Sequence, residues 1–187
     1  MFKATILGVD LTFETAPGLF SPGGPDAGTM AMLARVPLGA QTKLLDLGCG
    51  YGLVGVYAAA RIGPERVWMA DNDPVAVACA ARNLTLNGLA AAHVCLSDGV
   101  ASVDESAFTL IVCHPPYHAD FSVAKSFIEK GFNRLAVGGE LWMVTRREPW
   151  YRNKLAAIFG GVQVYPDAGY FVFRAQKRRD AYANRGR

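Results

Sequence analysis

"LLDLGCGYGLVG" (residues 44–55) contains four glycines and joins a short apolar strand, through a glycine-rich turn, to the start of a helix. Glycine allows a tight turn and a close approach of the backbone to a ligand, so this stretch predicts a strand, a binding loop and a helix in succession. Downstream of it, apolar strands alternate with amphipathic helical segments. Such alternation is typical of crossover units, and it predicts a doubly wound α/β domain with a mainly parallel sheet.

Seven strands and four helices are expected from residue 42 onward. The strands are expected at residues 42–48, 66–71, 92–98, 108–113, 139–145, 162–166 and 169–175. The helices are expected at residues 51–63, 73–88, 122–136 and 147–159. The second helix has the clearest ends, because Asp73-Pro74 supplies a cap and a first-turn residue and Asn87-Gly88 a left-handed stop.

The first 15 residues are predicted to form a β-hairpin that turns near Gly8. The sequence contains no repeats and no low-complexity linkers. We therefore expect a single domain over residues 1–187, in which residues 1–15 are a hairpin preface and residues 177–187 are a flexible basic tail.

With 51% hydrophobic and 19% charged residues, the 187-residue chain has a globular composition. No apolar run reaches the roughly 18 residues of a membrane helix, and the start, MFKATILGVD, is too short and too soon polar for a signal peptide. The four cysteines form no C-x-x-C pair, which disfavours zinc ribbons and redox motifs. We expect reduced thiols in a cytoplasmic monomer that does not bind membranes.

The net charge of +3 is modest but unevenly distributed. Residues 174–187 hold six Lys or Arg against one Asp, and aromatic residues interleave with the charges at residues 146–154. Such runs form either a solvated face and tail or a surface that attracts nucleic-acid phosphates. The second interpretation predicts RNA as the partner of these two segments.

The glycine loop allows two cofactor classes. Gly50, Gly52 and Gly55 spell G-x-G-x-x-G, and Asp71 follows at the end of the next strand, as in a dinucleotide-binding fingerprint. This pattern fits an NAD(P)-dependent oxidoreductase, and it also fits a glycine-rich turn that serves packing alone.

Asp46, Gly48 and Gly50 spell D-x-G-x-G, which favours a different cofactor. A carboxylate before the glycines suits an ammonium group better than a pyrophosphate. S-adenosylmethionine carries an ammonium and a sulfonium and no phosphate. Asp71 is then expected to accept from the ribose hydroxyls and Asp98 from the adenine amino group. Three carboxylates at consecutive strand ends favour S-adenosylmethionine over a dinucleotide.

Together these motifs resemble the class I "methyltransferase small" family over about residues 7–176. "PGLFSPGGPDAGTMAML" (17–33) resembles the family's segment before the first core strand, and "LLDLGCGYGLVGVYAA" (44–59) resembles its cofactor loop. "DNDPVAVACAARNLTLNG" (71–88) resembles its second strand and helix, and "GYFVFRAQK" (169–177) its closing strand. "VCHPPYH" (112–118) falls where the family carries Asn-Pro-Pro-Phe/Tyr.

The resemblance implies a Rossmann-like class I methyltransferase fold and S-adenosylmethionine as the cofactor. The chain is similar to the single-domain relatives of bacterial 16S rRNA guanine-N2 methyltransferases. The cofactor-binding residues that it implies are Phe20, Asp46, Gly48, Cys49, Gly50, Asp71, Asn72, Asp98 and His114.

The catalytic residues that it implies are His114, Pro115 and Tyr117. In the family motif, the Asn side chain and the first Pro carbonyl accept hydrogen bonds from an amino group, and the aromatic residue stacks on the extruded base. His114 replaces that Asn. A neutral imidazole has one acceptor nitrogen, which can orient an amine or act as a base.

The acceptor predicted from this motif is an exocyclic amine of guanine in ribosomal RNA. A protein glutamine, a small metabolite with a hydroxyl or a carboxylate, and a cofactor-binding pseudoenzyme stay open as alternatives, because His114 departs from the motif.

Other interpretations apply to the residues around the motif. His114, His118 and Asp120 suggest a metal site, but the intervening prolines forbid helical i,i+4 geometry, and we expect no metal. His118 is expected to be structural. Tyr117 can serve packing alone, and Trp68 and Trp142 are expected in the core.

Overall fold

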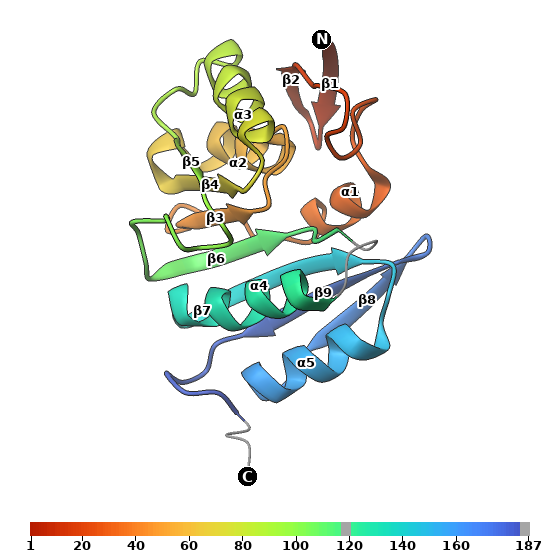
Figure 1. The fold of residues 1–187 in the computed structure, drawn as a ribbon, viewed down its shortest axis with the longest axis vertical. Coiled ribbons are helices and arrows are strands. Elements are labelled where there is room, and N and C mark those ends of the chain that lie inside the picture. The colour runs from red at the N-terminus through yellow and green to blue at the C-terminus, as the bar shows by residue number, and fades with distance from the viewer. Residues whose placement is uncertain (117–120, 184–187) are drawn as a thin grey trace.

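A seven-stranded sheet forms the centre of the fold (Figure 1). The structure, a computed structural model, describes residues 1–116 and 121–183. The strands are β3 (Leu44–Leu47), β4 (Val67–Asp71), β5 (His93–Leu96), β6 (Phe108–Cys113), β7 (Leu135–Thr145), β8 (Gln163–Asp167) and β9 (Tyr170–Gln176). Their order is β5-β4-β3-β6-β7-β9-β8, and β9 is antiparallel to both of its neighbours while the other pairs are parallel. The predicted doubly wound, mainly parallel sheet is confirmed.

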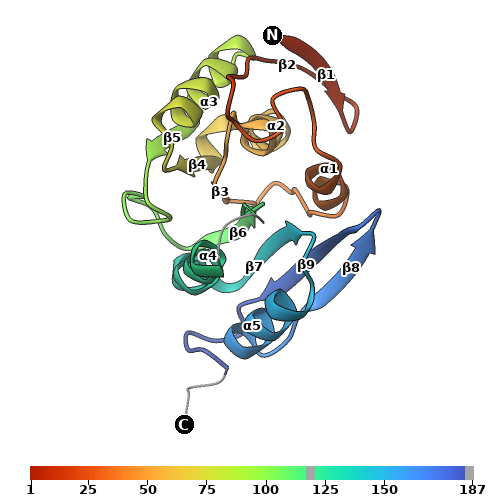
Figure 2. The ribbon, with the colours of Figure 1, turned by 45° about the vertical axis from the view of Figure 1, so that its right-hand side comes forward.

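Helices cover both faces of the sheet (Figure 2). On one face lie α1 (Ala27–Leu33), α2 (Leu53–Ile62) and α3 (Pro74–Leu86), and on the other lie α4 (Phe121–Arg134) and α5 (Pro149–Phe159). A 3₁₀ turn (Pro64–Arg66) connects α2 to β4. The strand side chains alternate accordingly, so that Leu44 and Leu110 pack toward α1–α3 while Leu45 and Ile111 pack toward α4 and α5. None of the helices within the described residues is long and apolar enough to cross a membrane.

The predicted N-terminal hairpin is confirmed as β1 (Phe2–Ile6) and β2 (Val9–Phe13), which form their own two-stranded sheet beside α2 and α3 (Figure 1). Leu7 and Gly8 both have positive φ, 46° and 84°, as a two-residue hairpin turn requires.

Asn83 of α3 fastens the hairpin to the sheet domain. It is fully buried, its amide nitrogen donates to the carbonyls of Glu14 (2.9 Å) and Tyr51 (2.7 Å), and its oxygen accepts from the Glu14 N–H (2.7 Å). One side chain thus satisfies three backbone groups from the chain after β2 and from the turn before α2.

Helix α1 was not predicted, because its seven residues are short for a helix and follow a stretch rich in Gly and Pro. Asp26 caps it by accepting a hydrogen bond from Thr29 N at 2.9 Å. The ring of Tyr170 holds it against β9: a Cβ on Gly28 would lie 2.4 Å from Tyr170 Cδ1, so only glycine permits this contact.

Residues 177–183, expected to belong to a flexible tail, make contacts with the sheet domain. Lys177 is only 5% exposed and donates to the Leu135 carbonyl at 2.8 Å. The ring of Tyr182 packs edge-on against Phe132 (5.0 Å between centroids), and its hydroxyl donates to the Glu129 carbonyl. This segment therefore covers the end of α4 and is part of the folded domain, while residues 184–187 lie outside the described part of the chain.

Asn83→Ala should destabilise the domain by about 2–4 kcal/mol, because it removes three hydrogen bonds of about 1 kcal/mol each and leaves buried backbone groups unpaired. Urea denaturation measures the free energy of unfolding. Arg82→Ala is the matched control, since Arg82 is exposed and its ion pair with Glu14 contributes less than about 1 kcal/mol. Equal losses in the two variants would contradict the role given to Asn83.

Candidate active site

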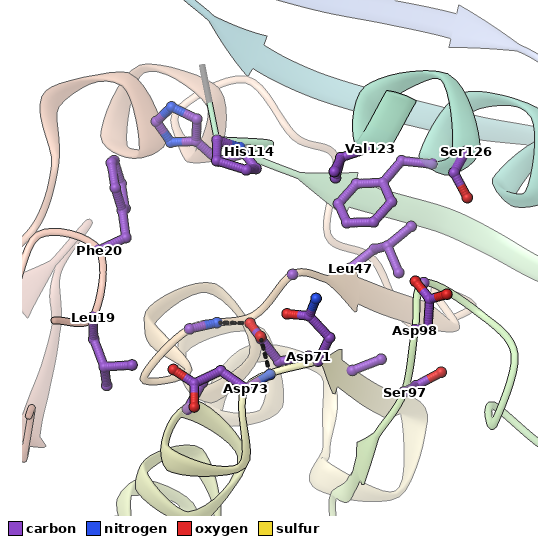
Figure 3. A pocket seen from close by; sticks show the side chains of 18 of the residues that line it. Leu19, Phe20, Leu47, Asp71, Asp73, Ser97, Asp98, His114, Val123 and Ser126 are labelled. Carbon is purple, nitrogen blue, oxygen red and sulfur yellow. Dashed lines mark hydrogen bonds between the residues drawn. The ribbon is translucent and has the colours of Figure 1, made fainter. Parts of the chain in front are cut away.

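A cavity of about 270 Å³ lies at the carboxyl ends of β3, β4, β5 and β6 (Figure 3). The strand order reverses between β3 and β6, and this is where ligands bind in open α/β sheets. The residues that line it are Gly18, Leu19, Phe20, Leu47, Gly48, Gly50, Ala70, Asp71, Asn72, Asp73, Ala76, Ser97, Asp98, Gly99, His114, Pro116, Val123, Ser126 and Phe127. Of the predicted cofactor residues, the structure brings together Phe20, Gly48, Gly50, Asp71, Asn72, Asp98 and His114.

The four glycines after β3 have two different functions: two line the cavity and two allow close packing against β4. Gly48 and Gly50 line the cavity with positive φ, 76° and 56°, and a Cβ on Gly48 would lie 3.3 Å from the Phe127 ring. Gly52 and Gly55 instead face Met69 on β4, where a Cβ would come within 2.7 and 2.5 Å of its side chain. The packing interpretation therefore holds for the last two glycines, and the glycine that a dinucleotide fingerprint would bring against a pyrophosphate, Gly52, is not at the cavity.

Asp71 is a fixed acceptor at the end of β4. One carboxylate oxygen accepts from Gly50 N (2.8 Å) and the other from Asp73 N (3.0 Å), as the dashed lines in Figure 3 show. Each oxygen of a carboxylate has a further lone pair. Asp71 can therefore accept a hydrogen bond from a ligand hydroxyl while it keeps the hydrogen bond from Gly50 N.

Asp46, predicted to meet an ammonium group, is not among the residues that line the cavity. Its carboxylate is 3% exposed and accepts from Gly55 N at 2.9 Å, at the start of α2. Its pKa is raised to about 7: burial is the largest cause, the Gly55 hydrogen bond lowers the pKa in part, and the nearby Asp71 also raises it. Asp46 therefore holds the start of α2, directly after the glycine loop, through this hydrogen bond.

Two other predicted residues are also outside the cavity lining. Cys49 is buried, and burial raises the pKa of its thiol well above the ordinary range, so it stays protonated. Pro115 is buried, and the neighbouring Pro116 lines the cavity. Tyr117, His118 and Asp120 lie outside the described residues.

His114 follows β6 with an almost fully buried side chain. Its Nδ1 lies 3.0 Å from Thr29 Oγ1 and 3.4 Å from Asp26 Oδ2, and its ring meets the exposed ring of Phe20 edge-on at 4.8 Å. Within the described part of the chain, its buried Nε2 has no hydrogen-bond partner.

Burial keeps the His114 imidazole neutral at neutral pH. Desolvation lowers its pKa below the ordinary value, Asp26 raises it in part, and Arg146 lowers it again. A neutral ring leaves one nitrogen with a free lone pair, as a hydrogen-bond acceptor or a base requires.

The sequence motifs of the chain match the methyltransferase small domain profile over residues 10–174. The chain is 32% identical, over 177 residues, to the ribosomal RNA small subunit methyltransferase C of Cronobacter sakazakii, covering 92% of this chain and 51% of the relative. The chain belongs to the methyltransferase small domain family. The predicted family is confirmed, and so is its Rossmann-like fold.

Two further relatives of this methyltransferase domain are similar over the same span. The ribosomal RNA large subunit methyltransferase G of Aeromonas hydrophila is 31% identical, over 91% of this chain and 47% of the relative. The solved structure of a T. thermophilus 16S rRNA N2 methyltransferase in complex with AdoMet and guanosine is 32% identical with a TM-score of 0.86, covering 95% of this chain and 50% of that one. The methyltransferase domain thus spans about half the length of these relatives.

Some cavity residues were missed from the sequence. Val123, Ser126 and Phe127 reach the cavity from α4. Their i, i+3, i+4 spacing directly after the His-Pro-Pro-Tyr segment was the available signal, since residues so spaced share one helix face. Among the described residues, no group of three or more His, Cys, Asp or Glu is arranged to hold a metal.

The two basic segments of the methyltransferase domain lie at opposite ends of the sheet. Arg146 and Arg147 follow the carboxyl end of β7, on the edge where the cavity lies. Lys177 pairs with Gly138 and Gly139 near the start of β7, roughly 20 Å away at about 3.3 Å per residue. Of the segments predicted to face RNA, only 146–154 begins beside the cavity.

Asp46 should make the methyltransferase domain less stable as the pH rises from about 4 to about 7. Its pKa is 3.8 in the ordinary state and about 7 when folded, so the unfolded chain loses this proton first and folding is disfavoured across that window. Asp46→Asn keeps an oxygen for Gly55 N but does not titrate. The free energy of unfolding of the wild type should therefore fall relative to Asp46→Asn between these pH values.

Urea denaturation at a series of pH values measures this difference. Asp10→Asn, which makes the same chemical change at an exposed position of the hairpin, is the matched control for the substitution itself. A constant difference between wild type and Asp46→Asn over the whole window would show that the carboxyl group titrates normally.

Proposed function

We propose that this chain is an S-adenosylmethionine-dependent methyltransferase that methylates a base amine in ribosomal RNA, with the exocyclic amine of guanine as its first candidate. The observation that carries the proposal is His114, which lines a cavity formed by the carboxyl ends of four strands and whose buried Nε2 has no hydrogen-bond partner among the described residues. Figure 3 shows His114 and Phe20 at one end of this cavity, Asp98 at the other and Asp71 between them.

The cavity residues fit a cationic nucleoside. Asp71 presents anchored oxygens for ribose hydroxyls, and Asp98 adds an exposed carboxylate at the end of β5. Phe20 is 45% exposed beside His114, which provides a flat apolar surface at the same end of the cavity. When bound, S-adenosylmethionine supplies an electrophilic methyl group on its sulfonium.

His114 supports the transfer by positioning the acceptor. The neutral Nε2 accepts one N–H of the amine and directs the nitrogen lone pair away from the imidazole, toward the methyl group. Such alignment of two reactants supplies a large share of the rate in itself. A stronger role, in which Nε2 takes the proton, needs the same neutral ring.

The relatives support an RNA acceptor. Two are named as ribosomal RNA methyltransferases of the small and of the large subunit, and the similar solved structure contains AdoMet and guanosine. These relatives act on different subunits, so guanine and its position are part of the proposal.

The RNA is proposed to approach over the edge that follows β7. Arg147 is exposed there and stacks over the Phe121 ring at 5.5 Å from its centroid, at the start of α4. An arginine held on an aromatic ring presents a fixed positive charge for a phosphate.

The direct test is methyl transfer from labelled S-adenosylmethionine to ribosomal RNA, with His114 variants. His114→Ala should lower kcat by about 10²–10⁴-fold, the usual contribution of a group that handles a proton or its hydrogen bond. Because the pKa of His114 is lowered, the acid limb of the wild-type pH profile should lie below the ordinary histidine range. His114→Asn should abolish that limb, and it retains activity if His114 orients the amine and loses it if His114 is a base.

Thermal denaturation with each cofactor provides the control for this test. S-adenosylmethionine should raise the melting temperature of wild type and of His114→Ala alike, and NAD should raise neither. Stabilisation by NAD alone would contradict the cofactor. Labelling of protein or metabolites in place of RNA would contradict the acceptor.

Arg147→Ala should weaken RNA binding and reduce the slope of log K against log salt by about 1, because one phosphate contact is lost. Fluorescence anisotropy with a ribosomal RNA fragment at several salt concentrations measures both. Arg178→Ala is the matched control, since Arg178 is exposed but lies beyond β9 at the opposite end of the sheet. An equal effect of both variants would show that binding is spread over the surface rather than centred on the cavity edge.

A further inference from the structure

His114 is the last member of a hydrogen-bonded chain that begins outside the cavity. Arg146 Nη2 donates to Tyr170 Oη at 3.0 Å, and Tyr170 Oη donates to Asp26 Oδ1 at 2.8 Å. The other oxygen of Asp26 lies 3.4 Å from His114 Nδ1 and accepts from Thr29. Three elements meet here: the cap of α1, the end of β7 and the start of β9.

We propose that Asp26, held by Tyr170, is a positioning residue that fixes the proton of His114 on Nδ1 and thereby leaves Nε2 as the acceptor nitrogen toward the substrate. The inference rests on the proposed function for its catalytic meaning, but the tautomer itself is a property of the free protein.

The geometry around Nδ1 favours one tautomer. The Thr29 hydroxyl lies 3.0 Å from Nδ1 and is also directed at Asp26 Oδ2, at 3.4 Å. If that hydroxyl donates to Asp26, it can only accept from Nδ1–H. In the opposite tautomer the Nδ1 lone pair would face the Asp26 carboxylate at 3.4 Å, which is electrostatically unfavourable.

Tyr170 prevents Asp26 from turning away. Its hydroxyl occupies Oδ1, while the N–H of Thr29 occupies Oδ2 at 2.9 Å, so both oxygens are held in place. The Tyr170 ring is itself fixed by close packing on Gly28 and meets the His114 ring edge-on at 6.0 Å. The carboxylate is therefore rigid with respect to the imidazole, as a group that sets a tautomer must be.

The charged and titratable groups around the imidazole act in opposite directions. Asp26 raises the pKa of His114, while Arg146 and burial lower it, with burial the largest effect. The net result is a neutral ring, and among neutral rings Asp26 selects the one with Nε2 unprotonated. The carboxylate thus determines which ring nitrogen carries the proton, while burial keeps the ring from binding a second proton.

Long-range ¹H–¹⁵N correlation NMR of the histidine rings reads the tautomer directly in the protein without substrate. The chain has three histidines, and His114→Asn assigns the signals by loss of one set. Wild-type His114 should show a protonated Nδ1 and an unprotonated Nε2. Asp26→Asn should shift the population toward the Nε2-protonated ring, because it removes the negative charge, while asparagine still caps α1.

The kinetic arm uses the same variants. Asp26→Asn should lower kcat by about 10- to 100-fold, the loss expected for one hydrogen bond to a charged group. Its acid limb should move to lower pH, since Asp26 raises the pKa of His114. Tyr170→Phe keeps the ring and should show a smaller loss of the same kind. Asp167→Asn, whose carboxylate pairs with Arg35, is the matched control with unchanged tautomer and kcat.

A double-mutant cycle separates positioning from a purely structural role. In the His114→Asn background, Asp26→Asn should change kcat by less than about 3-fold, because no imidazole remains to be oriented. An equal loss in both backgrounds, a wild-type His114 protonated on Nε2, or a tautomer unchanged by Asp26→Asn would each overturn the proposal. Absence of methyl transfer in the wild type contradicts the proposed function instead, and the NMR measurement still decides the role of Asp26.

Discussion

The pairing of β3 with β4 on one edge and β6 on the other determines where everything else lies. Because the chain leaves β3 toward α2 and leaves β6 toward α4 on the opposite face, the two connections diverge and leave a hollow over the carboxyl end of β3. Gly48 lies at this point, with α2 beyond it and the Phe127 ring of α4 against it. The glycine loop, the carboxylate of Asp71 and the imidazole of His114 lie close together because they follow β3, β4 and β6, which are adjacent in the sheet.

Local signals in the sequence were sufficient for the sheet and for the helices that follow its strands. Asp73-Pro74 and Asn87-Gly88 bound α3 to within two residues, because caps and stops act through the nearest backbone. Helix α1 could not be recognised in this way, since its packing depends on Tyr170, far away in the sequence. The same holds for residues 177–183, whose order comes from contacts with α4 and α5 and not from any pattern of their own.

The site residues that lie at strand ends could be predicted from the sequence. Those whose position depends on which face of the sheet or helix their side chain is on could not. Gly50, Asp71 and His114 meet because the carboxyl ends of parallel strands share one edge. Asp46 is still within β3, and alternation turns its side chain with Leu44 toward the helices of one face, away from the cavity. The Asp26 partner of His114 was equally invisible, because it depends on the helix that was missed.

The hydrogen bond between Tyr170 and Asp26 joins residues that are 144 positions apart. During synthesis, Asp26 emerges early and Tyr170 only after almost the whole sheet has been made, and contacts of such long range form late in folding. A nascent chain that already contains the glycine loop and His114 therefore still lacks the last strand that anchors Asp26 beside the imidazole. The geometry around His114 is completed only by β9, so a chain without this strand would lack the residue that anchors Asp26.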